Sequence, residues 1–280
     1  MSIRALFLDM DGVLWHDGHP LGDLPALFER IAALQLRVIF ITNNATRTVQ
    51  QYVEKMQSVG LTVAPEQILT AAQATLHALQ ETFPDGARVY VLGEGGLQET
   101  LKEGGFRIAN NEERGENGLL PTPDAVVVAL DRACTYAKLR EATLYVRRGA
   151  KFIGSNPDRT YPTREGLVPG AGALIASLEA STDQQAQIVG KPQPLLFQMA
   201  LARAGVAPDE ALVVGDRLET DIAGGQAAGC HTALVLSGVT TQAQAMTWEP
   251  APDLIAPDLE AVIAFLERER AWQGRRVVTP

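Results

Sequence analysis

The chain has 280 residues, enough for one large domain or two modest ones, and its 46% hydrophobic and 20% charged residues argue against disorder. A formal net charge of −9 argues against a general nucleic-acid or anionic-membrane binding surface, so a phosphate-bearing partner would need local positive charge. The two cysteines, Cys134 and Cys230, form no CxxC pattern, which argues against a disulfide scaffold or zinc module and indicates a reducing compartment.

The sequence also predicts a cytoplasmic protein. Its N-terminal apolar run is too short for a signal peptide and ends in carboxylates. No later segment supplies the roughly 18 uncharged apolar residues that a membrane span needs.

Eight short apolar runs recur along the chain, separated by helix-like stretches such as the one from Thr48 to Gly60. Apolar runs without alternation are typical of parallel strands covered on both faces. The sequence therefore predicts an α/β fold with a doubly wound parallel sheet. The expected strands are Ile3–Leu8, Val38–Ile41, Val89–Leu92, Ala125–Leu130, Lys151–Gly154, Ile188–Val189, Ala211–Val214 and Thr232–Leu236.

The long stretch between Thr42 and Lys191 has its own strand-helix alternation and predicts a second α/β unit inserted into the first. Turn-prone polar segments near residues 83–85 and 181–183 suggest its boundaries. We expect one domain from residues 1–82 and 183–280, and an insert from 83–182.

Polar side chains follow directly after four of the apolar runs: Asp9 and Asp11, Thr42 and Asn43, Lys191, and Asp216. In open parallel sheets the ligand crevice lies outside the carboxyl ends of the strands. We therefore expect these side chains to meet in one crevice.

The segment Asp9-Met10-Asp11-Gly12 can place two carboxylates together, because side chains two residues apart in an extended segment face the same side. Close carboxylates repel, and a divalent metal would relieve that repulsion. The alternative is a simple surface turn, since Asp and Gly are common turn residues.

Asp216 can supply a third carboxylate, and Asp221 can cap the following helix or orient a metal-bound water. Magnesium prefers an octahedron of oxygens, which Asp9, Asp216 and a backbone carbonyl would suit. Thr42 and Lys191, with Asn43 beside them, would then donate to phosphoryl oxygens. The alternative for Asp216 and Asp221 is that they only mark the N-terminus of a helix. The alternative for Lys191 is that it is an ordinary solvated lysine.

The ordered segments DMDG, ITNN, GKP and VGDRLETD resemble the four motifs of the haloacid dehalogenase (HAD) superfamily of aspartate-nucleophile phosphatases. DGVLW, TNNATRT, GSNPD, GKPQP and LSGVTT are similar to subfamily IIA, the p-nitrophenyl phosphatase and nucleotide monophosphatase branch. The resemblance runs from about Ile3 to Gly238.

This resemblance implies that Asp9 is the nucleophile that takes the phosphoryl group as an aspartyl-phosphate. Asp11 would protonate the leaving oxygen and then activate water. Thr42 and Lys191 would bind the phosphoryl oxygens.

It further implies that Mg²⁺ is held by Asp9, Asp216 and the Asp11 carbonyl. Asp221 would contact these ligands and not the metal itself. The insert would be a cap that closes over the site and selects the substrate. Asn156 and Asp158 would either contact the substrate or only form a turn in this cap, and both readings stay open.

The implied partner is a small phosphomonoester such as a nucleoside monophosphate or p-nitrophenyl phosphate, with no nucleic-acid polymer and no membrane. Similar proteins are often homo-oligomers, although nothing in the sequence marks an interface.

A phospho-acceptor signalling module is an alternative, opposed by the DxD spacing and the large insert. A metal-independent dehalogenase of the same superfamily is another, opposed by Asp11 and Asp216. A phosphomutase, which would retain the phosphoryl group for transfer, is a third.

Overall fold

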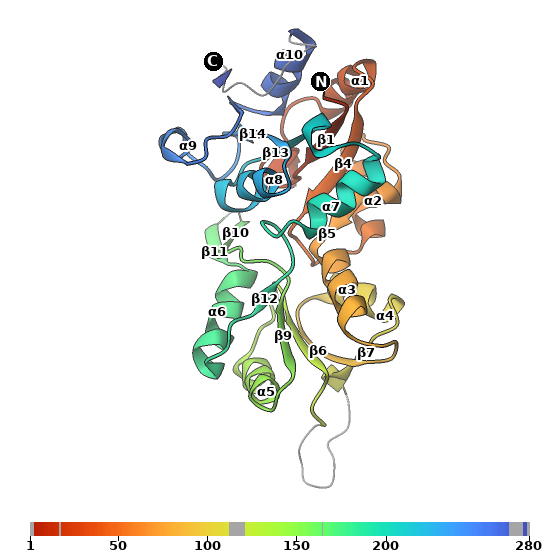
Figure 1. The fold of residues 1–280 in the computed structure, drawn as a ribbon, viewed down its shortest axis with the longest axis vertical. Coiled ribbons are helices and arrows are strands. Elements are labelled where there is room, and N and C mark those ends of the chain that lie inside the picture. Colours follow the sequence, from red (N-terminus) through yellow and green to blue (C-terminus); the bar gives the residue numbers. More distant parts are fainter. Residues whose placement is uncertain (1–2, 17, 112–120, 164, 269–276, 279–280) are drawn as a thin grey trace. The chain divides into compact units, whose positions relative to one another are not determined.

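The computed structural model describes residues 3–16, 18–111, 121–163, 165–268 and 277–278, which fold as two compact units (Figure 1). The first unit comprises the residues up to Thr42, Val49–Leu69 and the residues from Lys191 onward. The second comprises Asn43–Thr48 and Thr70–Gly190. The expected insert of 83–182 lies inside the second unit, and its division from the rest at those residues stays a prediction.

A seven-stranded sheet forms the centre of the first unit, in the order β16-β15-β14-β13-β1-β4-β5. The pairs from β16 through β4 are parallel. The carboxyl ends of β13, β1 and β4 therefore lie side by side, where an open sheet forms its ligand crevice. The strands are β1 (Ala5–Leu8), β4 (Arg37–Thr42), β5 (Ile68–Thr70), β13 (Ala211–Gly215), β14 (His231–Val235), β15 (Leu254–Ala256) and β16 (Val277–Val278).

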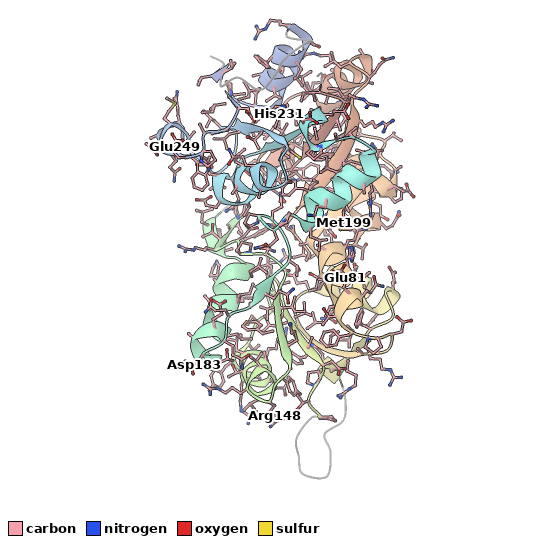
Figure 2. All side chains as sticks on the ribbon, viewed as in Figure 1. Glu81, Arg148, Asp183, Met199, His231 and Glu249 are labelled. Atoms are coloured by element: carbon pink, nitrogen blue, oxygen red, sulfur yellow. The ribbon has the colours of Figure 1, made fainter. Side chains whose placement is uncertain are left out.

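Helices cover both faces of this sheet, because its central strands are apolar at successive positions. Leu6 and Leu8 of β1 join one apolar cluster with residues of α1, α2 and α10, whereas α7 packs against β4 and β1, and α8 against β14. Figure 2 shows Met199 on α7. The helices are α1 (Leu24–Ala33), α2 (Val49–Ser58), α7 (Leu195–Ala204), α8 (Ala223–Ala227), α9 (Gln242–Thr247) and α10 (Leu259–Arg268). A small hairpin pairs β2 (Trp15–His16) with β3 (His19–Pro20).

The second unit has its own five-stranded parallel sheet, in the order β12-β9-β8-β6-β7. Its strands are β6 (Arg88–Leu92), β7 (Arg107–Ile108), β8 (Ala125–Val128), β9 (Lys151–Gly154) and β12 (Gln187–Ile188). An antiparallel hairpin of β10 (Thr160–Thr163) and β11 (Gly166–Pro169) lies apart from that sheet. The helices are α3 (Ala71–Thr82), α4 (Gly95–Glu103), α5 (Tyr136–Arg147) and α6 (Ala171–Thr182).

The predicted α/β fold with a doubly wound parallel sheet is confirmed, and each expected strand is present with ends shifted by two residues or fewer. One placement is wrong. The strand before Lys191 belongs to the sheet of the second unit, where β12 pairs with β9, so Lys191 does not follow a strand of the sheet that carries Asp9.

Among the described residues, no helix combines the length and the apolar character needed to cross a membrane.

Candidate active site

Asp9 lies at the end of β1, whose four residues are all buried. Its backbone N–H donates to the Val214 carbonyl at 2.9 Å and extends the pairing with β13 by one residue. The chain then turns back, because the Met10 carbonyl accepts the backbone N–H of Leu14 at 2.9 Å. Gly12 has φ +88°, and a Cβ there would lie 2.6 Å from Oδ2 of Asp216. Only glycine allows this turn so close to a carboxylate.

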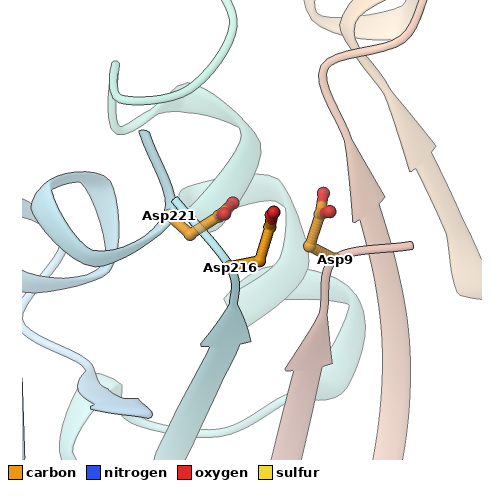
Figure 3. Close-up of side chains that lie close together, drawn as sticks. All are labelled: Asp9, Asp216 and Asp221. Carbon is orange, nitrogen blue, oxygen red and sulfur yellow. The ribbon is translucent and has the colours of Figure 1, made fainter. Parts of the chain in front are cut away.

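Asp216 follows β13, the neighbour of β1. Its Oδ2 accepts the Val239 backbone N–H at 2.7 Å, and a Cβ at Gly238 would collide with the same carboxylate. Asp221 lies in the five-residue π-helical segment Leu218–Ile222, and its Oδ2 accepts the Arg217 N–H at 3.1 Å. Such π-helical turns are frequent at functional sites. Both acids are therefore held by backbone donors beside Asp9 (Figure 3).

Lys191 joins two of these acids. Its Nζ donates to Oδ1 of Asp9 at 2.5 Å and to Oδ1 of Asp221 at 2.5 Å. A third bond, at 3.3 Å, goes to the carbonyl of Ile41, the residue before Thr42 at the end of β4. A buried ammonium with three acceptors ties the ends of β1 and β4 to the segment that carries Asp221.

The three carboxylates of Asp9, Asp216 and Asp221 offer ligand oxygens that all lie within 4.8 Å of one another. Asp9 is 9% exposed, Asp216 2% and Asp221 1%, so water screens their mutual repulsion poorly. An all-oxygen set of this kind is what Mg²⁺ prefers. These residues fit a divalent metal.

The electrostatics agree with that fit. Burial, opposed by the charge of Lys191, raises the pKa of Asp9 well above its ordinary value. Burial and the charge of Asp221 raise the pKa of Asp216 to about 7. Burial by itself would lower the pKa of Lys191, but the charges of Asp221 and Asp9 outweigh it, and the pKa of this ammonium is raised. One lysine therefore does not neutralise the three acids, and a divalent cation would complete the balance.

A pH-dependent stability follows from Asp216. Between its ordinary pKa of 3.8 and about 7, the native metal-free protein binds more protons than the unfolded chain. In EDTA, we expect the unfolding temperature to rise as the pH is lowered from about 8 to about 6, by roughly 2–4 °C for each kcal/mol gained. Saturating Mg²⁺ should reduce this rise, because a bound cation keeps the carboxylates ionised. Scanning calorimetry with Asp216→Asn as control tests this, and an identical rise in that variant would contradict it.

Asp11 lies outside the cluster of three acids. Its Oδ1 accepts the indole Nε1–H of Trp15 at 2.8 Å, and Nζ of Lys55 lies 4.0 Å from the same oxygen. The strand ends at Leu8, and Asp11 is not one of the three acids whose ligand oxygens lie together, so a shared face for the Asp9 and Asp11 carboxylates stays a prediction.

The expected residues of the second unit form a network of their own. The Asn156 side-chain amide donates to the Asn43 carbonyl at 2.8 Å and accepts the Asp158 N–H at 3.1 Å. The Asn43 amide in turn donates to Oδ1 of Asp158 at 3.3 Å. Asn156 is 4% exposed, so this network fixes residues 43–48 to the second unit. A role of these side chains toward a substrate stays a prediction.

Sequence reasoning missed the residues of the LSGVTT segment that hold the site. Val239 fixes Asp216, and the Ser237 hydroxyl donates to the Gly12 carbonyl at 2.7 Å. The segment contributes to the resemblance, but only the fold shows that it packs against residues more than 200 positions earlier. Trp15 and Lys55 were missed in the same way.

Family models match both ends of the chain. A haloacid dehalogenase-like hydrolase model matches residues 6–107, and a HAD-hydrolase-like model matches residues 188–262. The acid sugar phosphatase of Staphylococcus aureus is 35% identical over 265 residues, which is 95% of this chain and 98% of that protein.

Solved structures agree. The glycerol phosphate phosphatase of Mycobacterium tuberculosis, in complex with magnesium, is 35% identical with a TM-score of 0.82, over 93% of this chain and 76% of that one. The p-nitrophenyl phosphatase of Archaeoglobus fulgidus is 30% identical with a TM-score of 0.84, over 95% of this chain and 100% of that one. NagD of E. coli is 32% identical with a TM-score of 0.80, over 93% of this chain and 98% of that one. The chain belongs to the haloacid dehalogenase-like hydrolases, in the subfamily IIA branch that contains the p-nitrophenyl phosphatases and NagD.

Proposed function

We propose that the chain is a Mg²⁺-dependent phosphatase that hydrolyses small phosphomonoesters through an aspartyl-phosphate on Asp9. The observation that carries this proposal is the buried Asp9 carboxylate, bonded to Lys191 beside two further buried acids. The relatives named as phosphatases support the reaction class.

In the first step, a carboxylate oxygen of Asp9 attacks phosphorus, and the bond from phosphorus to the ester oxygen breaks. The electron pair of that bond goes to the leaving oxygen, which takes a proton from Asp11. The products are an alcohol and an aspartyl-phosphate.

In the second step, water attacks phosphorus while Asp11 takes one of its protons. The bond from phosphorus to the Asp9 oxygen breaks, so Asp9 returns as a carboxylate, Asp11 regains its proton, and inorganic phosphate leaves. A covalent intermediate divides one hard displacement into two easier ones.

Thr42, Asn43 and Lys191 are proposed to hold the phosphoryl oxygens. Lys191 is buried, so water only weakly screens the attraction between its charge and the transferring phosphoryl group. Electrostatic stabilisation of that group supplies much of the catalysis. Asp9, Asp216 and the Asp11 carbonyl would hold the Mg²⁺, with Asp221 orienting them through Lys191 and the Arg217 backbone. The metal, when bound, would neutralise charge on these acids and on the transferring phosphoryl group.

The second unit is proposed to act as a cap that excludes water and selects the substrate, with Asn156 and Asp158 on its loops. We propose a small sugar or polyol phosphate as the substrate, because relatives that match more than nine-tenths of this chain are named acid sugar phosphatase and glycerol phosphate phosphatase.

The test is phosphate release from p-nitrophenyl phosphate and from a panel of sugar, polyol and nucleoside monophosphates, with Mg²⁺ and with EDTA. We expect phosphate release with Mg²⁺. With EDTA the rate should fall about 10²-fold or more, because a bound metal stabilises the transition state by several kcal/mol. Release undiminished by EDTA would contradict the metal requirement. No release from any ester, together with a stable phosphoryl group transferred from acetyl phosphate to Asp9 as acetate leaves, would favour the signalling module.

A further inference from the structure

The immediate surroundings of Asp11 are built from two residues that the proposed reaction does not yet use. Trp15 has no exposed surface, and its only polar side-chain atom, Nε1, donates to Oδ1 of Asp11 at 2.8 Å. A buried indole whose N–H finds one acceptor holds that acceptor in place, because leaving the N–H unpaired would cost free energy.

Lys55, in the last turn of α2, completes this arrangement. Its Nζ lies 3.7 Å from the centroid of the Trp15 ring and 4.0 Å from Oδ1 of Asp11. The side chain of Lys55 is 16% exposed, so most of it is shielded from water where it lies against the ring. Cation–π contacts are strongest when the cation is desolvated in this way.

The backbone makes the arrangement rigid. Asp11 and Trp15 form a backbone bridge, and the Gly12 N–H donates to the Trp15 carbonyl at 2.8 Å. The Trp15 ring belongs to the apolar cluster that includes Tyr52 and Met56 of α2. Helix α2 and the turn after β1 therefore fix the indole, and the indole fixes the carboxylate.

We propose that Trp15 and Lys55 are positioning residues for Asp11, a role that rests on the phosphatase function proposed above. The indole N–H holds one oxygen of the Asp11 carboxyl group, so the other oxygen carries the proton that passes to the leaving oxygen. Lys55 keeps the ring and the carboxyl group in a fixed position relative to each other. Trp15 has no exposed surface, so it acts through Asp11 and not on the substrate.

The test measures how kcat/KM depends on the leaving group. Phenyl phosphate and p-nitrophenyl phosphate have similar shapes, but phenolate needs protonation far more than the stable p-nitrophenolate does. Because kcat/KM reports only the steps up to leaving-group departure, the later attack of water does not affect the comparison of the two esters. In Trp15→Phe, we expect kcat/KM for phenyl phosphate to fall about 10-fold or more relative to p-nitrophenyl phosphate, a fraction of what a general acid contributes. Lys55→Met should change this ratio in the same direction by less.

Trp248→Phe is the matched control. The Trp248 indole nitrogen has no hydrogen-bond partner in the part of the chain that the structure describes, and its ring packs against a separate cluster with Leu218 and Ile222. This variant should leave the ratio of the two esters unchanged.

Equal losses on both esters in Trp15→Phe and in Lys55→Met would overturn the inference, since a merely structural role lowers both rates together. If Trp15→Phe does not fold, the ratio in Lys55→Met alone decides. Failure of the wild-type protein to hydrolyse any phosphomonoester would instead overturn the proposed function.

Discussion

Replacing Asp9 by asparagine is expected to lower the turnover of p-nitrophenyl phosphate by about 10⁴-fold or more while the protein stays folded. The amide cannot attack phosphorus, so no aspartyl-phosphate forms and the two-step route is closed. Only binding and electrostatic contributions from Lys191 and the remaining acids would act on the substrate.

The fold should tolerate this change because the amide has nearly the shape of the carboxyl group. Burial raises the pKa of Asp9, which means that the ionised form is disfavoured there, and the variant removes that burden. Lys191 keeps its bond to Asp221. In EDTA at pH 8, the unfolding temperature of the variant should equal or exceed that of the wild type.

A matched Asp→Asn control is available at Asp183, which lies after α6 with φ +58° (Figure 2). Asparagine tolerates this left-handed conformation, and the side chain of Asp183 is 85% exposed, so the variant should keep full activity. Phosphate release and circular dichroism on both variants provide the measurement. Turnover in Asp9→Asn within about tenfold of the wild type would remove Asp9 from the nucleophile role.

The sheet strands were predictable because each is a short apolar run buried on both faces, as in Ala125–Val128. Two missed strands, Ile68–Thr70 and Leu254–Ala256, are also buried but only three residues long, and the other missed strands lack this signal. Val277–Val278 and Arg107–Ile108 have two residues each, and Thr160–Thr163 contains a proline. Such strands form because a neighbour offers free backbone groups, which a local pattern does not reveal.

The site was predictable where a residue follows its strand directly, as Asp9 follows β1 and Asp216 follows β13. The contacts of a side chain in the turn after a strand were not predictable. The i, i+2 rule holds only in extended chain, and the Met10 carbonyl closes a turn that sends the Asp11 carboxylate to Trp15.

Lys191 shows a second limit of prediction from local sequence patterns. Its short apolar run does form a strand, but the run carries no information on which sheet that strand joins. The lysine reaches Asp9 through a contact 182 residues apart, which only the assembled fold creates. The motif resemblance placed it correctly beside the acids, although the strand argument did not.

Lys191→Met is expected to have the largest effect on stability. Lys191 is 2% exposed and its ammonium bonds two carboxylates, so its loss leaves buried negative charges without their cation. Removing one partner of a buried ion pair typically costs about 3–5 kcal/mol. In EDTA at pH 8 we expect a loss of this order, measured by chemical unfolding.

The loss should shrink at lower pH and with Mg²⁺. Without Lys191 the pKa of Asp9 would rise further, because the charge that lowers it is gone, and a protonated carboxyl group tolerates burial. A divalent cation would replace the missing positive charge, so Mg²⁺ should raise the unfolding temperature of the variant more than that of the wild type.

Lys138→Met in the second unit is the matched control. Lys138 also bonds a buried acid, Asp131, at 2.7 Å, but its own side chain is 36% exposed and water screens the pair. Its loss should cost less than that of Lys191 and should not respond to Mg²⁺. If Lys191→Met is as stable as the wild type in EDTA, or if Mg²⁺ stabilises all three proteins equally, Lys191 does not balance the buried acids of the site.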